Sequence, residues 1–118
     1  MSWDASLECG CCGHDLIDRN YTHNTSRMIY GALQDAGVVL PNPDGHGTVA
    51  WWGHLNGMTG PEGAAYLDAI LTHLAKDPGR YRAMNPENGW GNYDDLVTVL
   101  TEMRDAVPEH PTAWRASG

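Results

Sequence analysis

The chain has 118 residues, of which 42% are hydrophobic, and its 15 acidic and 7 basic side chains give a formal net charge of −8. This length predicts one domain with a single core, and the acidic balance disfavours binding to nucleic-acid phosphates. No apolar run reaches the length of a membrane span, and the N-terminus lacks the basic start and apolar core of a signal peptide, so we expect a cytoplasmic protein that does not use a membrane.

Residues 2–21 predict a β-hairpin. In the stretch SWDASLEC, the residues Trp3, Ala5, Leu7 and Cys9 alternate with polar residues, which is the period of a strand with one buried face. The glycine-bounded stretch GCCGH predicts a turn, and DLIDRNY is expected to return as the second strand.

The segment 24–107 predicts three main helices. The first carries an apolar stripe at helical spacing. Its N-cap is expected to be Asn24 or Thr25, and Gly37 suits its C-terminal end. Residues 38–48 contain two Pro and two Gly and predict a loop.

A short helix is expected next and ends at Gly57. The second main helix has the strongest local signal, because Thr59 and Glu62 stand at the spacing of a capping box. A short helical turn is expected after Asp77, which suits its N-cap.

The third main helix is expected over 93–106, with Asn92 as its cap. The tail 108–118 is expected to be extended. The chain therefore predicts a single α+β domain over 1–118, in which the N-terminal hairpin packs against one layer of helices.

Three segments together resemble a family of small proteins found in actinobacteria and their phages. They are DRNYTHNTSRM, WWGHLNGMTGPEGAAYLDAI and RYRAMNPENGWGNYDDLVTVLTEMRD, and the resemblance covers residues 15–107. Its most specific parts are YTHN and NPENGWGNY. The resemblance implies an actinobacterial or phage origin and one coherent domain, and in the phage case the cytoplasm of the host cell. The family has no assigned activity, so the resemblance implies no catalytic residues.

The turn of the hairpin is a candidate metal site. Cys9 and Cys12 stand at C-x-x-C spacing, which lets two thiolates approach one Zn²⁺, and Cys11 or His14 could complete the site locally. The other candidate ligands are histidines distant in the sequence, His23, His46 and His54. The alternative is a reduced thiol cluster without metal, because closed zinc sites normally show a second pair of ligands.

Two stretches at predicted helix entrances are rich in amides, hydroxyls and aromatic rings: DRNYTHNTSRM at 18–28 and NPENGWGNYDD at 85–95. Free backbone N–H groups at a helix start bind polar ligands, and a Trp in a turn is costly to leave exposed. We therefore predict one pocket, lined by Tyr21, His23, Asn24, Asn88, Trp90 and Asn92. The alternative is a closed hydrogen-bond network that only caps the two helices.

Three functional hypotheses follow. The first is a non-enzymatic protein that binds a nucleotide-like or metabolite ligand, such as a nucleotide signal of host defence in a phage setting. A phosphorylated ligand would require a local cluster of cations from Arg19, Arg27, Arg80 and Arg82. The second is an interaction module that binds a host or phage protein through a Trp-rich surface. The third, a hydrolase using His23 or His54, is disfavoured because no recognisable catalytic motif is present.

Overall fold

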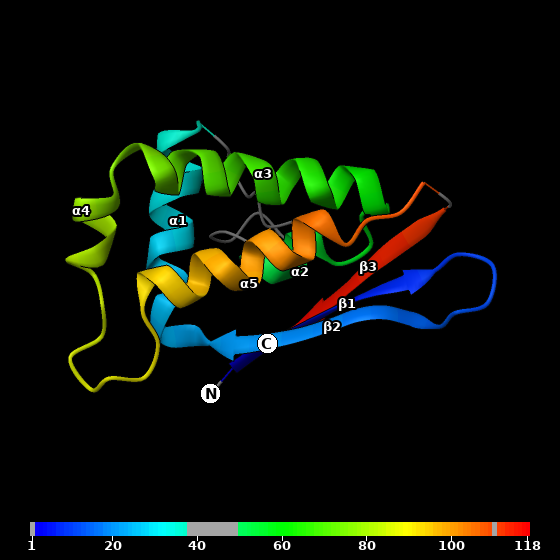
Figure 1. Cartoon of the computed structure of the whole chain (residues 1–118), viewed down its shortest axis with the longest axis horizontal. Helices are drawn as coiled ribbons and strands as arrows, with labels where there is room; N and C mark the ends of the chain where they lie inside the picture. The colour runs from blue at the N-terminus through cyan, green and yellow to red at the C-terminus, as the bar shows by residue number, and fades with distance from the viewer. Residues whose placement is uncertain (1, 38–49, 110) are drawn as a thin grey trace, which may run out of the picture.

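The structure is a computed structural model that describes residues 2–37, 50–109 and 111–118. The predicted loop over 38–48, which includes His46, lies outside the described residues. The elements follow in the order β1 (Ser2–Cys9), β2 (Asp15–Thr22), a short 3-10 helix η1 (His23–Thr25), α1 (Ser26–Asp35), α2 (Trp51–Leu55), α3 (Gly60–Lys76), α4 (Pro78–Arg82), α5 (Tyr93–Asp105) and β3 (Thr112–Ser117) (Figure 1).

The three strands form one antiparallel sheet in the order β2-β1-β3. In this register Trp3 of β1 lies opposite Tyr21 of β2, and Leu7 lies opposite Trp114 of β3. An irregularity between Leu7 and Glu8 precedes the hairpin turn. The α+β class and the N-terminal hairpin are thereby confirmed.

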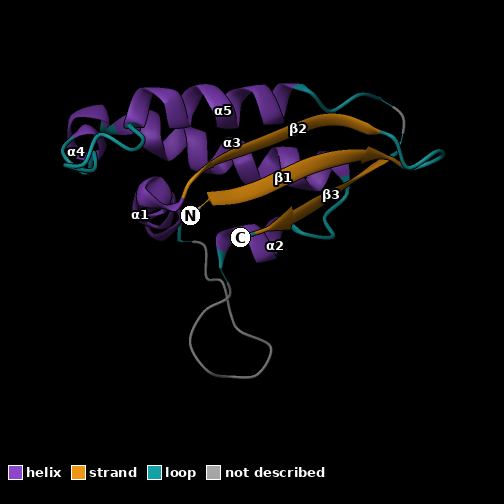
Figure 2. Cartoon of the chain, turned by 90° about the horizontal axis from the view of Figure 1, so that it is seen from below, coloured by secondary structure: helices purple, strands orange, loops and turns teal. Residues whose placement is uncertain are grey.

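The helices cover one face of the sheet. Helices α3 and α5 lie side by side in opposite directions, and the sheet forms a separate layer beside them (Figure 2). The face of β1 that carries Trp3, Ala5 and Leu7 is fully or almost fully buried, whereas Ser2 and Asp4 on the other face are exposed. The alternation in the sequence therefore reports the buried face correctly.

The capping signals of the two long C-terminal helices are confirmed. The Thr59 hydroxyl accepts from the Glu62 N–H at 3.3 Å, and the Glu62 carboxylate accepts from the Thr59 N–H at 3.1 Å. The carboxamide oxygen of Asn92 accepts from the Asp95 N–H at 2.8 Å. Each cap satisfies N–H groups that have no partner inside the helix.

Thr25, one of the two residues predicted to cap the first helix, is confirmed at the N-cap position of α1, whereas Asn24 lies inside the preceding 3-10 turn. A 3-10 turn precedes α1, and its cap is Thr22, whose hydroxyl accepts from the Asn24 N–H at 3.2 Å. Thr25 occupies the N-cap position of α1 without a side-chain cap bond, and its hydroxyl donates back to the Thr22 carbonyl at 3.1 Å. The first side-chain cap therefore lies at Thr22, before the start of α1, because β2 runs directly into the 3-10 turn.

The predicted extended tail is part of the sheet. Strand β3 pairs with β1, and its outer edge is also bonded, since Trp114 N–H donates to the Met58 carbonyl at 2.8 Å. The Trp114 side chain is 1% exposed and its indole N–H donates to the Gly60 carbonyl at 3.2 Å. The C-terminus therefore contributes to the core. No helix in the described ranges has the length and apolar character to cross a membrane.

Candidate functional site

The two polar stretches lie side by side, as the sequence predicted. The loop between α4 and α5 passes the end of β2 (Figure 1), where the Tyr21 hydroxyl accepts a hydrogen bond from the Asn92 N–H at 3.0 Å. The carboxamide of Asn24 donates to the Trp90 carbonyl at 3.3 Å. These contacts join segments 71 and 66 residues apart in the chain.

A hollow of about 600 Å³ opens between the two stretches, and we call it the Trp90 hollow. Its lining residues are Ser2, Asn20, Tyr21, Thr22, Asn24, Asn88, Trp90 and Gly91. The Trp90 side chain is 71% exposed, whereas Trp3, Trp51 and Trp114 are at most 1% exposed. The hollow therefore combines an accessible indole with amide and hydroxyl groups.

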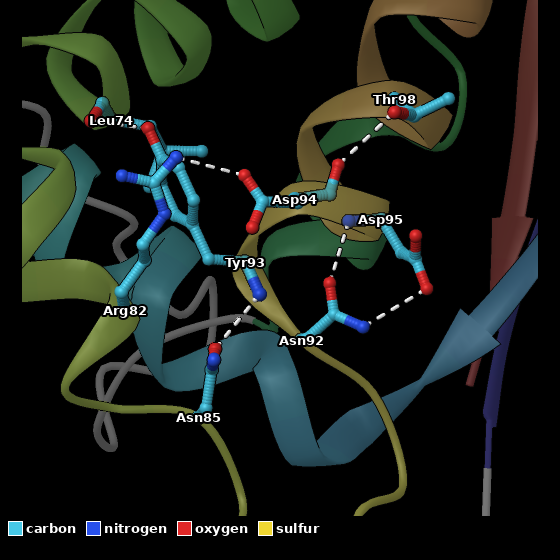
Figure 3. Close-up of polar contacts among 8 residues, drawn as sticks. All are labelled: Leu74, Arg82, Asn85, Asn92, Tyr93, Asp94, Asp95 and Thr98. Carbon is cyan, nitrogen blue, oxygen red and sulfur yellow. Dashed lines mark hydrogen bonds and ion pairs between the residues drawn. The ribbon is translucent and has the colours of Figure 1, made fainter.

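Four of the six predicted pocket residues line the hollow: Tyr21, Asn24, Asn88 and Trp90. The other two do not. The His23 ring packs on Trp52, with ring centroids 4.5 Å apart, and lines a separate hollow with it. The Asn92 side chain is used as the cap of α5, where its amide also donates to the Asp95 carboxylate at 3.0 Å (Figure 3).

Four lining residues were not among the six predicted: Asn20, Thr22 and Gly91, which belong to the two polar stretches, and Ser2, which lies outside them. The pairing of Ser2 with Thr22 places both at the same end of the hairpin. The sequence alone could indicate on which face of its own strand each of the hydroxyls of Ser2 and Thr22 lies. Only the register of the hairpin places the two residues opposite each other.

Gly91 permits the close approach of the two stretches. Its φ is +98°, and a Cβ at this position would meet Cγ2 of Thr22 and would lie 3.0 Å from Cγ2 of Thr25. Gly89 also has a positive φ, +75°, but a Cβ there would meet nothing within 4 Å. The loop can therefore seat against the end of β2 only with glycine at position 91.

Several polar groups in the hollow remain available to a ligand. The Asn88 carboxamide oxygen accepts from the Trp90 N–H at 3.0 Å, and this bond holds the loop. It does not use the NH₂ group of Asn88. Within the described residues, that NH₂ group and the side chains of Ser2 and Asn20 have no hydrogen-bond partner. The hydrogen bonds between the two stretches therefore leave some donors and acceptors of the hollow unused.

Among the residues that the structure describes, no charged side chain lines the hollow. None of the four arginines proposed for a phosphorylated ligand lines the hollow. Three are paired: Arg19 with Glu102 at 2.9 Å, Arg80 with Asp35 at 2.7 Å and Arg82 with Asp94 at 2.9 Å. The fourth, Arg27, is exposed and forms no ion pair within the described residues. The hydrogen bond from Arg82 lowers the pKa of the Asp94 carboxyl below its usual value (Figure 3). These pairs lie on exposed surfaces and leave the hollow neutral.

The hairpin tip brings three thiols together. The Sγ atoms of Cys9, Cys11 and Cys12 all lie within 4.8 Å of one another, close enough to bind one metal ion. The turn is held by the Gly13 N–H, which donates to the Cys9 carbonyl at 2.9 Å, and by the Cys9 N–H, which donates to the His14 carbonyl at 2.8 Å. Among the described residues, His14 is not part of this group.

The thiols differ in environment. Cys9 is 7% exposed, and its Sγ lies 2.9 Å from Sγ of the exposed Cys11. Hydrogen bonds from Cys11 and then Cys12 lower the pKa of the Cys9 thiol to about 6. The same contact raises the pKa of the Cys11 thiol. Cys9 therefore supplies a thiolate near neutral pH, which is the form that binds metals.

The histidines proposed for a hydrolase pack on aromatic rings. His54 lies 5.5 Å from the Tyr66 ring, and His23 lies against Trp52. Neither imidazole hydrogen-bonds to a carboxylate or hydroxyl of the described residues, so no base is oriented for catalysis there.

Comparison with protein-family models, with curated proteins and with solved structures found no match.

Proposed function

We propose that this chain is a non-enzymatic binding protein that holds a small polar ring ligand in the Trp90 hollow. The observation that carries the proposal is the 71% exposed Trp90 indole at the edge of a hollow lined by amides and hydroxyls. A ligand that covers one face of the exposed indole removes its apolar surface from water, which is worth about 25 cal/mol per Å². The surrounding polar groups would fix the orientation of the ligand.

The alternative, a hydrogen-bond network that only joins and caps the two helix entrances, explains fewer of the groups in the hollow than ligand binding does. Capping and joining of the two stretches use Thr22, Asn92 and the Tyr21 hydroxyl. They do not use the Trp90 ring or the Asn88 NH₂ group. A Trp-rich docking surface is also poorly supported, because all five Trp lie in the described ranges and only Trp90 is strongly exposed.

Binding is tested by nuclear magnetic resonance with a panel of sugars, nucleosides, nucleotides and amino acids added to the ¹⁵N-labelled chain. We expect ligand-dependent shifts of the Trp90 indole and of the Asn24 and Asn88 side-chain amides. Trp90→Ala should abolish or strongly weaken these shifts without changing the melting temperature. Leu16→Ala is the matched control, since Leu16 is also an exposed apolar side chain, at 41%, and lies outside the hollow.

The result that contradicts the proposal has two parts. No compound shifts the Trp90 resonance, and Trp90→Ala lowers the melting temperature as an architectural residue would.

The setting of this function is the cytoplasm of an actinobacterial cell, or of the host when the chain is phage-encoded. The resemblance of the YTHN and NPENGWGNY segments to actinobacterial and phage proteins supports this part of the proposal. Fractionation of actinobacterial cells expressing the tagged chain should recover it in the cytosol. Recovery in the medium or in the membrane fraction would contradict the setting.

A zinc site is the second candidate function, favoured by the convergence of Cys9, Cys11 and Cys12. Three thiolates supply three of the four ligands of a tetrahedral Zn²⁺, with His14 or water as the fourth. The Gly10 N–H, next to these thiols, donates to the Pro111 carbonyl at 2.8 Å, so the hairpin tip is already bonded to the chain before β3.

Elemental analysis of protein purified without added metal tests this site. We expect about one zinc per chain and a lower melting temperature after chelation. Cys11→Ser and Cys12→Ser should lose the metal, and His14→Ala tests whether the fourth ligand is the imidazole. The absence of zinc together with unchanged melting in a chelator rules out a structural zinc site.

A further inference from the structure

The chemistry of the Trp90 hollow restricts its ligand further, on the basis of the proposed function. We infer that the hollow binds an uncharged sugar ring, and not a nucleotide. Three features of the hollow favour a sugar: its charge, its hydrogen-bonding groups and its exposed aromatic ring.

Charge excludes phosphorylated ligands. The eight lining residues include no Arg, Lys, His, Asp or Glu. Binding of a phosphate relies on charge-assisted hydrogen bonds, above all from Arg or Lys. The chain has a net charge of −8, and Arg19, Arg80 and Arg82 are each bonded to a carboxylate away from the hollow. Arg27 has no ion pair within the described residues, but it does not line the hollow, so a nucleotide would meet no cation on the described lining to hold its phosphate.

The hydrogen-bonding groups match hydroxyls. The lining contains three carboxamides, from Asn20, Asn24 and Asn88, and three hydroxyls, from Ser2, Tyr21 and Thr22. Carboxamides and hydroxyls both donate and accept, and each hydroxyl of a sugar does the same. The Asn88 NH₂ group and the Asn24 carboxamide oxygen supply a donor group and an acceptor, since the other halves of these side chains bond to the Trp90 backbone.

The exposed ring supplies the apolar contact. The face of an indole carries partial negative charge, which attracts the partially positive C–H groups on the flat side of a pyranose. The backbone of Trp90 is held at the hollow, because its N–H donates to the Asn88 carboxamide and its carbonyl accepts from the Asn24 carboxamide. A sugar ring can therefore lie on the indole while its edge hydroxyls reach the amides.

The probes are the methyl pyranosides of glucose, galactose, mannose and N-acetylglucosamine, compared with glucuronic acid, adenosine, uridine and AMP. Each is titrated into the ¹⁵N-labelled chain at low and high salt. We expect at least one neutral pyranoside to shift the Trp90 indole resonance with the same affinity at both salt concentrations, because no charge is involved. Glucuronic acid and AMP should bind at least about tenfold more weakly, a difference typical of one poorly matched polar group.

Three variants at two positions test the contact with the ligand. Trp90→Ala should reduce pyranoside affinity by about tenfold, and Trp90→Phe should reduce it less because a smaller ring remains. Asn88→Asp keeps the oxygen that accepts from the Trp90 N–H but removes the NH₂ donor, so it should weaken binding while preserving the loop. Asn56→Asp is its matched control, because the Asn56 oxygen accepts from the Ala116 N–H at 3.0 Å outside the hollow.

Failure of this inference differs from failure of the proposed function. If adenosine, uridine or AMP shifts the Trp90 resonance and no pyranoside does, the hollow is a binding site and the sugar assignment is overturned. If binding of the pyranosides weakens strongly with salt, the assignment to an uncharged ligand is also overturned. If no compound of either kind affects the hollow, both the inference and the proposed function fail.

Discussion

The hydroxyl of Tyr21, at the end of β2, accepts a hydrogen bond of 3.0 Å from the backbone N–H of Asn92, which caps α5. This bond holds together the two walls of the Trp90 hollow. It satisfies an N–H at a helix entrance that a local side chain would otherwise have to satisfy.

Removal of this hydroxyl should loosen the loop before α5. We expect Tyr21→Phe to lower the free energy of unfolding by about 1 kcal/mol, the net value of one hydrogen bond. Hydrogen exchange should become faster at the Asn92 N–H. The Leu96 N–H, which donates to the Asn92 carbonyl inside α5 at 3.1 Å, should keep its protection. Equal acceleration at both amides would mean that the bond supports the whole helix and not the loop alone.

Glycines 89 and 91 should respond differently to substitution. Gly89→Ala should cost about 1 kcal/mol because only its positive φ is strained. Gly91→Ala should cost more, since its Cβ would also meet Cγ2 of Thr22. The measurement is urea unfolding of the two variants.

The double variant Gly91→Ala with Thr22→Ser isolates the steric part of this cost. Serine keeps the hydroxyl that caps the 3-10 turn and removes Cγ2, so it should recover part of the stability lost in Gly91→Ala. No recovery would show that backbone strain alone sets the cost.

The Cys9 thiol should make stability depend on pH. Its pKa is lowered from 9.0 to about 6 in the folded chain by hydrogen bonds from Cys11 and Cys12. The unfolded chain therefore binds more protons between these values, and stability rises with pH across this range. The contribution is complete above about pH 9 and is lost as the pH falls through about 6.

Unfolding of the reduced, metal-free chain from pH 5 to 9 measures this effect against Cys9→Ser. The difference in unfolding free energy between the two proteins should increase with pH. Thiolate absorbance should titrate near pH 6 in the native chain and at higher pH in Cys11→Ala, which loses the principal hydrogen bond. A pH-independent difference would contradict the thiolate assignment.

Trp114 should be essential for folding of the whole domain. Trp114→Ala removes a side chain that is 1% exposed, and a large aromatic deletion from a core costs about 3–5 kcal/mol. Arg115→Ala is the control on the same strand. Its side chain is 72% exposed and forms only a surface ion pair with Glu8 at 2.9 Å, so we expect little change. Comparable losses in thermal unfolding would refute the core role of β3.

Local signals in the sequence predicted most of the elements. The alternation from Trp3 to Cys9 identified a strand and its buried face, because side chains of a strand point alternately to opposite sides. The pair Thr59 and Glu62 identified the start of α3, because both partners of a capping box lie within one helical turn. Such patterns need no information from distant parts of the chain.

Long-range pairing decided the rest. The sequence predicts that the C-terminal tail is extended. Its role as strand β3 depends on pairing with β1, about a hundred residues earlier in the chain, and on burial of Trp114 against α3. The Trp90 hollow has the same origin. Its four predicted residues belong to stretches whose composition is visible in the sequence, whereas Ser2 lies outside both stretches and joins the hollow through its pairing with Thr22 in the hairpin. His23 and Asn92 leave it because Trp52 and the first turn of α5 offer them closer partners. Composition thus indicated which groups were available, and only the packing of strand, 3-10 turn and loop decided which of them face one space, since the orientation of each side chain is set by contacts across the fold.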